Sequence, residues 1–246
     1  MDVASSHHRS VTALSSRRPR LTIVEQHTAF ADALEGSLWG RFKVRKVIVA
    51  STATAAGVVT ATRATNPDLT LVTTRLGPYI SGEAVIDGLA RTGHTVVALC
   101  PSSAEADPVR WGRCLGAGAI GVLSQSCGLA TLHEALDRAC VGESHLDRAQ
   151  ADRLLAAARR DDADHWSART RLASLTPRER EVMTHLMGGL CTAEIARRAV
   201  VSEATVRTQI KSVLTKLGVR SQLAAVAVAR QAGWSAPAEH WLSVAS

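Results

Sequence analysis

Short apolar runs alternate with longer amphipathic stretches through residues 21–143 of this 246-residue chain. Each run has the length and the β-branched content of a buried strand, and apolar residues at helical spacing follow it. Parallel strands need such helical crossovers between them. The pattern predicts an α/β domain with a doubly wound, five-stranded parallel sheet, whose functional site lies at the carboxyl ends of the strands. Strands are expected at 21–25, 42–50, 69–73, 94–100 and 119–123, and helices at 27–39, 52–64, 82–92, 104–116 and 129–141.

The composition supplies a core and excludes several classes of protein. Hydrophobic residues make up 46% of the chain and charged residues 21%, which is typical of a globular protein rather than a disordered one. There is no apolar run of about 18 residues and no signal-peptide core at the start, so we expect a cytoplasmic protein that does not bind membranes. The five cysteines include no Cys-x-x-Cys pair, and we interpret them as small buried side chains. Neither a metal site nor a cofactor is expected, because no cysteine or histidine cluster has ligand spacing.

Positive charge is concentrated toward the C-terminus. Within a net charge of +7, residues 172–246 hold nine basic and five acidic side chains, whereas residues 21–143 hold ten basic and eleven acidic ones. A small basic segment indicates a polyanionic partner, with nucleic acid as the first choice. The Ala-rich stretch at 149–160 favours a helix, and the aspartates that follow weaken it. The expected parts are a disordered basic tail (1–20), the α/β domain (21–143), a partly helical linker (144–171), a second domain (172–235) and a C-terminal tail (236–246).

Four short helices are predicted in the second domain from capping residues and apolar spacing. Thr176 with Glu179 three residues later has the pattern of a capping box, and Gly188-Gly189 ends that first helix. Two short helices with a tight turn follow, and the second of them presents polar and basic side chains outward, which describes a helix-turn-helix. The second domain is therefore predicted to be all-α. The outward side chains of this second helix, about 203–217, are Arg207, Thr208, Gln209, Lys211 and Lys216.

This geometry assigns roles in binding double-stranded DNA. The amino-terminal half of the helix at 203–217 should enter the major groove, where Arg207 and Lys211 can reach guanine or phosphate. Thr208 can contact a thymine methyl group or a phosphate, and Gln209 can read adenine or bridge to the backbone. The other candidates would hold the phosphate backbone: Thr192, Ser202 and Thr205 near helix starts, and Lys216, Arg220 and Ser221 from the far side.

The run LTPREREVMTHLMGGLCTAEIARRAVVSEATVRTQIKSVLTKLGVRSQLAAVAVARQAGW closely resembles the LuxR/NarL-type DNA-binding domain. The resemblance implies a sequence-specific transcriptional regulator, for which RNA polymerase would be a partner if it activates. In that family the last helix pairs two copies of the chain, which implies a homodimer on an inverted repeat. Its apolar face exceeds what a four-helix core needs, through Leu223, Ala224, Val226 and Ala227.

Residues 21–143 resemble the receiver domain of bacterial response regulators, through the phrases IVEQHTAF, NPDLTLVTTRLGPYISG and GAGAIGVLSQ. In that family two acidic residues hold magnesium, an aspartate accepts a phosphoryl group, and a hydroxyl and a lysine complete the pocket. These positions fall here on Glu25 and Gln26, Thr73 or Thr74, Cys100 and Gln125. Only Glu25 keeps the family's residue type. The resemblance therefore implies a degenerate receiver, in a regulator that acts without aspartyl phosphorylation.

Other functions of the first domain remain open from the residues alone. It could serve only as a dimerisation scaffold, or it could sense a small ligand that switches DNA binding. A conventional phosphorylation switch would need Glu25 and an unusual acceptor. An enzyme that binds a flavin or a nucleotide is disfavoured, because neither G-x-G-x-x-G nor G-x-x-x-x-G-K-[ST] follows the first strand.

Overall fold

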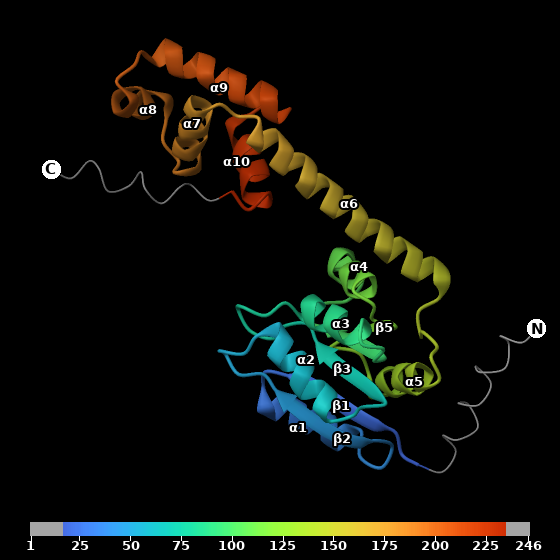
Figure 1. Cartoon of the computed structure of the whole chain (residues 1–246). Helices are drawn as coiled ribbons and strands as arrows, with labels where there is room; N and C mark the ends of the chain where they lie inside the picture. The colour runs from blue at the N-terminus through green and yellow to red at the C-terminus, as the bar shows by residue number, and fades with distance from the viewer. Residues whose placement is uncertain (1–16, 235–246) are drawn as a thin grey trace, which may run out of the picture. The chain divides into compact units, whose positions relative to one another are not determined.

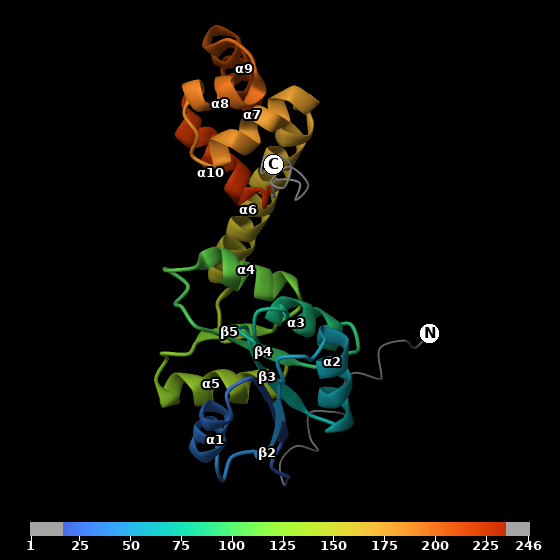
Figure 2. The same cartoon turned by 90° about the vertical axis from the view of Figure 1, so that its left-hand side faces the viewer.

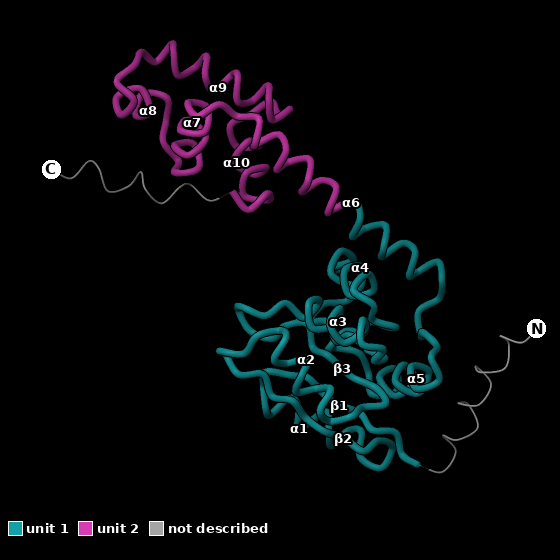
Figure 3. Tube along the Cα trace, viewed as in Figure 1, with its two compact units in different colours: residues 1–159 teal, residues 160–246 magenta. Residues whose placement is uncertain are grey.

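The computed structural model describes residues 17–234 and divides the chain into two compact units. The units comprise residues 1–159 and 160–246 (Figure 3). Most of the expected N-terminal tail (1–20) and all of the expected C-terminal tail (236–246) lie outside the described residues. No described helix is both long enough and apolar enough to cross a membrane.

The first unit is a five-stranded, fully parallel sheet flanked by helices, as the alternating pattern predicted (Figure 1). The strands lie in the order β2-β1-β3-β4-β5. A parallel sheet with crossover helices on both faces is a doubly wound fold. The strands are β1 (Arg20–Glu25), β2 (Lys43–Ile48), β3 (Leu69–Thr73), β4 (Val96–Cys100) and β5 (Gly121–Ser124), and the helices are α1 (Thr28–Ser37), α2 (Ala55–Ala64), α3 (Gly82–Ala90), α4 (Pro108–Gly116) and α5 (Leu129–Cys140).

Alternate residues of the central strands fill two separate apolar layers. Ile23 and Leu71 pack on the face that α1 and α5 cover, whereas Val24 and Val72 pack on the face that α2, α3 and α4 cover (Figure 2). Burial on both faces explains why these strands are continuous apolar runs in the sequence. Because the strands are parallel, side chains just beyond their carboxyl ends gather at one edge of the sheet.

A single helix, α6 (Arg148–Ala173), covers most of the expected linker. The aspartates after residue 160 do not interrupt it, although helix propensity predicted that they would weaken it. Its first turns pack Leu154 into the core of the first unit, and its last turns pack Ala168 and Leu172 into the core of the second. Burial of apolar side chains at both ends of α6 outweighs the weak helix propensity of its middle residues.

The second unit contains four short helices, in agreement with the predicted helix-turn-helix domain. They are α7 (Pro177–Met187), α8 (Thr192–Ala199), α9 (Glu203–Leu217) and α10 (Gln222–Gln231). Thr176 and Glu179 form the predicted capping box: the Glu179 amide donates to the Thr176 hydroxyl at 3.3 Å, and the Thr176 amide donates to the Glu179 carboxylate at 2.8 Å. Apolar side chains from all four helices, among them Met183, Ile195 and Val206, form one core.

The cysteines fit their interpretation as buried side chains only in part. All five are free thiols. Cys100 and Cys114 are buried, Cys127 and Cys140 are half-buried, and Cys191 is exposed because it precedes the first turn of α8. The expectation of burial was therefore wrong for Cys191.

Candidate functional site

The turn between α8 and α9 positions the candidate recognition helix. Val200 ends α8 in the left-handed region, with φ 53° and ψ 47°, and its side chain is 89% exposed. Ser202 then caps α9, because its hydroxyl accepts a hydrogen bond from the amide of Thr205 at 3.1 Å. A β-branched residue rarely adopts this conformation, so the packing of the two helices imposes the turn.

The solvent face of α9 presents the side chains expected to contact DNA. Thr205, Arg207, Thr208 and Lys211 are exposed, and the residues between them that face the core are buried. Arg207 forms an ion pair with Glu203 one turn earlier, with 2.9 Å between Nη2 and Oε2. Exposed pairs of this kind contribute little, so the guanidinium is available to another anion. Within the described residues, the ammonium of Lys211 forms no ion pair.

Lys216, which we expected to hold the DNA backbone, is paired within the second unit in this structure. Its ammonium lies 2.6 Å from a carboxylate oxygen of Glu179 and donates to the carbonyl of Ser174 at 3.4 Å. The second oxygen of Glu179 accepts a hydrogen bond from the hydroxyl of Ser212 at 2.7 Å. A buried carboxylate without a cation is costly, and the long lysine side chain reaches back to supply one. Lys216 thus ties α9 to α7.

The carboxylate of Glu179 is the most strongly perturbed acid in the second unit. Burial raises its pKa, but hydrogen bonds from Lys216, Ser212 and Thr176 outweigh burial and lower the pKa to about 2. Sequence reasoning assigned Glu179 to the capping box alone. The burial of Glu179 could have been predicted from its spacing. It precedes Met183 by four residues and Leu186 by seven, which places it on the buried face of α7.

The remaining polar candidates divide between capping residues and exposed ones. Gln209 is half-buried, and its side-chain oxygen is buried without a hydrogen-bond partner, so it does not project freely as expected. Thr192 is the half-buried first residue of α8, and Arg220 is exposed. Ser221 caps α10 by accepting from the amide of Ala224 at 3.1 Å. A hydroxyl that accepts from a helix amide can still donate to a phosphate.

The apolar face of α10 is only partly used by its own core. Leu223 is 80% exposed and Ala227 is exposed, while Ala224 is half-buried. Val226 differs from the other three because it packs against the core of the second unit. The open part of the face is therefore formed by Leu223, Ala224 and Ala227.

In the first unit, the receiver-like positions meet at the carboxyl edge of the sheet. Glu25 ends β1, Thr73 ends β3, Cys100 ends β4, and Gln125 follows β5. One oxygen of the buried Glu25 carboxylate accepts hydrogen bonds from the amides of Gln26 and His27, both at 2.8 Å. This carboxylate therefore holds the loop between β1 and α1.

Neither threonine at the acceptor position resembles an activated nucleophile. The hydroxyl of Thr73 is buried and donates to the carbonyl of Val24 at 3.1 Å. Thr74, one residue later, is also buried. Cys100, at the family's hydroxyl position, packs its sulfur 3.9 Å from that of Cys114, and Gln125 is exposed. Among the described residues, no acid or base is hydrogen-bonded to the Thr73 hydroxyl.

The donors at this edge do not suit magnesium. Magnesium is usually held by one or two carboxylates together with water, and the one carboxylate present already accepts amide hydrogens. Across the described residues, no group of three or more His, Cys, Asp or Glu side chains could hold a metal ion.

Comparisons with known proteins match both units. Residues 173–229 match the family described as "Bacterial regulatory proteins, luxR family". The nitrate/nitrite response regulator protein NarL of Escherichia coli (strain K12) is 31% identical over 162 residues, which cover 65% of this chain and 72% of NarL. Response regulator RamR of Streptomyces coelicolor is 29% identical over 146 residues, covering 59% and 64% of the two chains.

Two solved structures that match most of the chain are described as response regulators. The crystal structure of ChrA, the response regulator of a heme-sensing two-component system, is 24% identical, covers 88% of this chain and 98% of its own, and has a TM-score of 0.44. The structure of an RcsB–DNA complex is 18% identical, covers 87% and 99%, and has a TM-score of 0.46.

Proposed function

This chain belongs to the NarL-type bacterial response regulators with a luxR-family DNA-binding domain, and we propose that it regulates transcription as a homodimer without phosphorylation of an aspartate. One observation supports regulation without phosphorylation of an aspartate. The end of β3, where the family's aspartate accepts the phosphoryl group, holds Thr73 and Thr74 instead.

The chemistry of phosphoryl transfer supports this view. A hydroxyl attacks phosphorus far less readily than a carboxylate unless a base activates it, and the hydroxyl of Thr73 already donates to a carbonyl. Transfer also needs cations to neutralise the charge of the phosphoryl group. The lysine position carries the neutral Gln125, and the carboxylate of Glu25 is engaged by its own loop.

We propose that α9 enters the major groove, with Arg207 and Lys211 as the residues that read bases or bind phosphate. The exposed Thr205, Thr208 and Arg220 would bind phosphates, together with Thr192 and the capping hydroxyls of Ser202 and Ser221. Gln209 and Lys216 are left out of this set because the amide oxygen of Gln209 is buried and the ammonium of Lys216 is paired with Glu179.

The dimer would form through the open face of α10, made of Leu223, Ala224 and Ala227. Removing the exposed Leu223 side chain from water contributes to pairing, and two symmetric copies would place their α9 helices on an inverted repeat. Contact with RNA polymerase would follow only if the protein activates transcription. A helix-turn-helix chain with no activated nucleophile at its strand ends gives no support to an enzymatic role.

The test is a labelling experiment on the full-length protein. Incubation with phosphoramidate or acetyl phosphate and magnesium should leave no acyl phosphate detectable by intact mass. The variant Thr73→Asp should also remain unlabelled, because Gln26 and Gln125 still replace the acid and the lysine. Labelling of the native chain that hydroxylamine removes would refute phosphorylation independence.

A further inference from the structure

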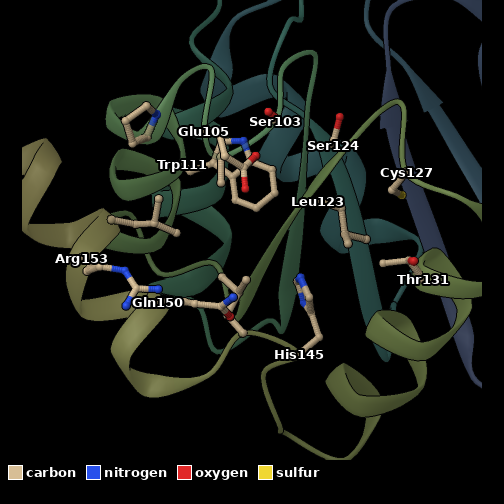
Figure 4. A pocket seen from close by; sticks show the side chains of 14 residues that line it. Ser103, Glu105, Trp111, Leu123, Ser124, Cys127, Thr131, His145, Gln150 and Arg153 are labelled. Atoms are coloured by element: carbon tan, nitrogen blue, oxygen red, sulfur yellow. The ribbon is translucent and has the colours of Figure 1, made fainter.

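A cavity of about 550 Å³ lies in the first unit, between α4, β5, α5 and the first turns of α6 (Figure 4). None of the receiver-like residues Glu25, Gln26, Thr73, Thr74, Cys100 and Gln125 lines it. Its volume is within the range of roughly 300–1,000 Å³ that is usual for small-molecule sites.

Part of the cavity wall is apolar, and the apolar side chains that form it are held in the core of the first unit. Trp111 of α4, Leu123 of β5 and Leu154 of α6 line it. The indole of Trp111 is held in place, since its N–H donates to the carbonyl of Ser102 at 2.9 Å. An aromatic side chain held rigidly in the cavity wall favours an aromatic ligand, because pairs of rings are stabilised beyond the area they bury.

Hydrogen-bonding groups lie on the α6 side. Arg153 lines the cavity, and its guanidinium has no hydrogen bond or ion pair within the described residues. Gln150 accepts a hydrogen bond from the amide of Asp147 with its side-chain oxygen at 3.2 Å, which leaves its NH₂ group to donate. Two unpaired donors, one of them a cation, favour an anionic oxygen acceptor.

His145 occupies the floor of the cavity, and its ring projects toward Leu123 (Figure 4). A Cβ on Gly121 would lie 2.8 Å from the ring nitrogen Nδ1, so the glycine is what allows the imidazole to lie against β5. Burial lowers the pKa of His145 and favours the neutral ring. His145 therefore adds a neutral polar ring to the cavity and no positive charge.

Glu105 on the α4 side limits how much negative charge the cavity can take. Its carboxylate lines the same cavity as Arg153, and hydrogen bonds from its own backbone amide and from Ser103 lower its pKa. A ligand with two negative charges would meet one cation and one anion. A ligand with a single negative charge at the α6 side avoids Glu105.

We propose that this cavity binds a planar aromatic monocarboxylate, with its ring against Trp111 and Leu123 and its carboxylate on Arg153 and Gln150. A ligand in this cavity would also contact α6, because Leu154 lines the cavity. A Cβ on Gly112 of α4 would lie 2.0 Å from the carbonyl oxygen of Leu154, so the two helices are in backbone contact beside the cavity. A ligand that contacts Leu154 would therefore affect how the start of α6 packs on α4.

Isothermal titration of the full-length protein with benzoate, 1-naphthoate and 9-anthroate tests the site. We expect at least one of these to saturate below about 1 mM. Arg153→Gln should weaken that binding about tenfold, the effect of losing one charged hydrogen bond. The matched variant Arg148→Gln removes an exposed arginine of the same helix that does not line the cavity, and it should leave affinity unchanged.

Neutral and doubly charged analogues test the charge selectivity. 1-Naphthalenemethanol should bind native protein and Arg153→Gln equally weakly, and 1,8-naphthalenedicarboxylate should bind more weakly than 1-naphthoate. Thr131→Trp should weaken binding of 1-naphthoate by narrowing the cavity, because Thr131 is an exposed residue of α5 that lines it. The proposal is overturned if no carboxylate saturates, if the alcohol binds as tightly as the acid, or if the two arginine variants behave alike. An effect of ligand on DNA binding rests on the proposed function, whereas binding itself is measured without DNA.

Discussion

Replacing Glu179 with glutamine should destabilise the helix-turn-helix unit by about 3 kcal/mol at pH 7. Burial raises the pKa of this carboxyl, but Lys216, Ser212 and Thr176 lower it from 4.5 to about 2. Each unit of pKa corresponds to 1.36 kcal/mol, so a shift of about 2.5 units corresponds to about 3 kcal/mol. The Glu179 side chain is 9% exposed and that of Lys216 is 33% exposed, so solvent screens the ion pair only in part.

The contribution of Glu179 depends on pH in a defined direction. Because its pKa is lowered in the folded state, the stability it adds is present in full above about pH 4.5 and is lost as the pH falls through about 2. The difference between native protein and Glu179→Gln should therefore shrink to about half at pH 3.

Hydrogen exchange measured by mass spectrometry on the full-length chain separates the two units. After correction for intrinsic rates, amides of α7 and α9 should exchange about 150-fold faster in Glu179→Gln at pH 7, while those of α1 and α5 serve as an internal control. Lys216→Met should have a similar effect, and the double variant should cost less than the sum of the two. Unchanged protection of α7 and α9, or the same loss at pH 7 and pH 3, would refute this reasoning.

Three further predictions concern individual side chains. The double variant Arg207→Ala/Lys211→Ala should abolish sequence-specific gel shifts and lower the salt dependence of residual binding, and retained specificity would contradict the role of α9. Val200→Gly should stabilise the second unit by about 1 kcal/mol in hydrogen exchange of α8, because glycine adopts φ 53° without strain; a loss of protection would show that Val200 has a packing role. Native alkylation with iodoacetamide should modify Cys191 first and spare Cys114, because contact with Cys100 and burial raise the pKa of Cys114; equal labelling would contradict this burial.

Most of the sheet could be predicted because both of its faces are buried. A strand such as β3 (Leu69–Thr73) has no polar side to obscure its limits, and the expected and observed bounds agree. The start of α4 was expected at 104, but the helix begins at Pro108, because Asp107 caps it by accepting from the amide of Arg110 at 3.0 Å. The capping signal was present in the sequence and outweighs the periodicity of the residues before it.

Side-chain partners in the candidate sites were harder to predict because they depend on tertiary contacts. Exposure of Arg207 and Lys211 follows from their helical spacing alone. The engagement of Lys216 with Glu179 does not, because 37 residues separate them and only the packing of α9 on α7 brings them together. The cavity beside Trp111 also depends on a contact between distant segments, the approach of α6 to α4 at Gly112.

We propose that the second unit binds DNA and that the first unit stores no phosphate. The most direct measurement is the affinity of the full-length protein for DNA selected from a random pool, by fluorescence anisotropy, with and without acetyl phosphate and magnesium. We predict dissociation constants that agree within twofold, an energy difference of about 0.4 kcal/mol. Binding that becomes tenfold tighter, together with an acyl phosphate on the protein, would contradict the account.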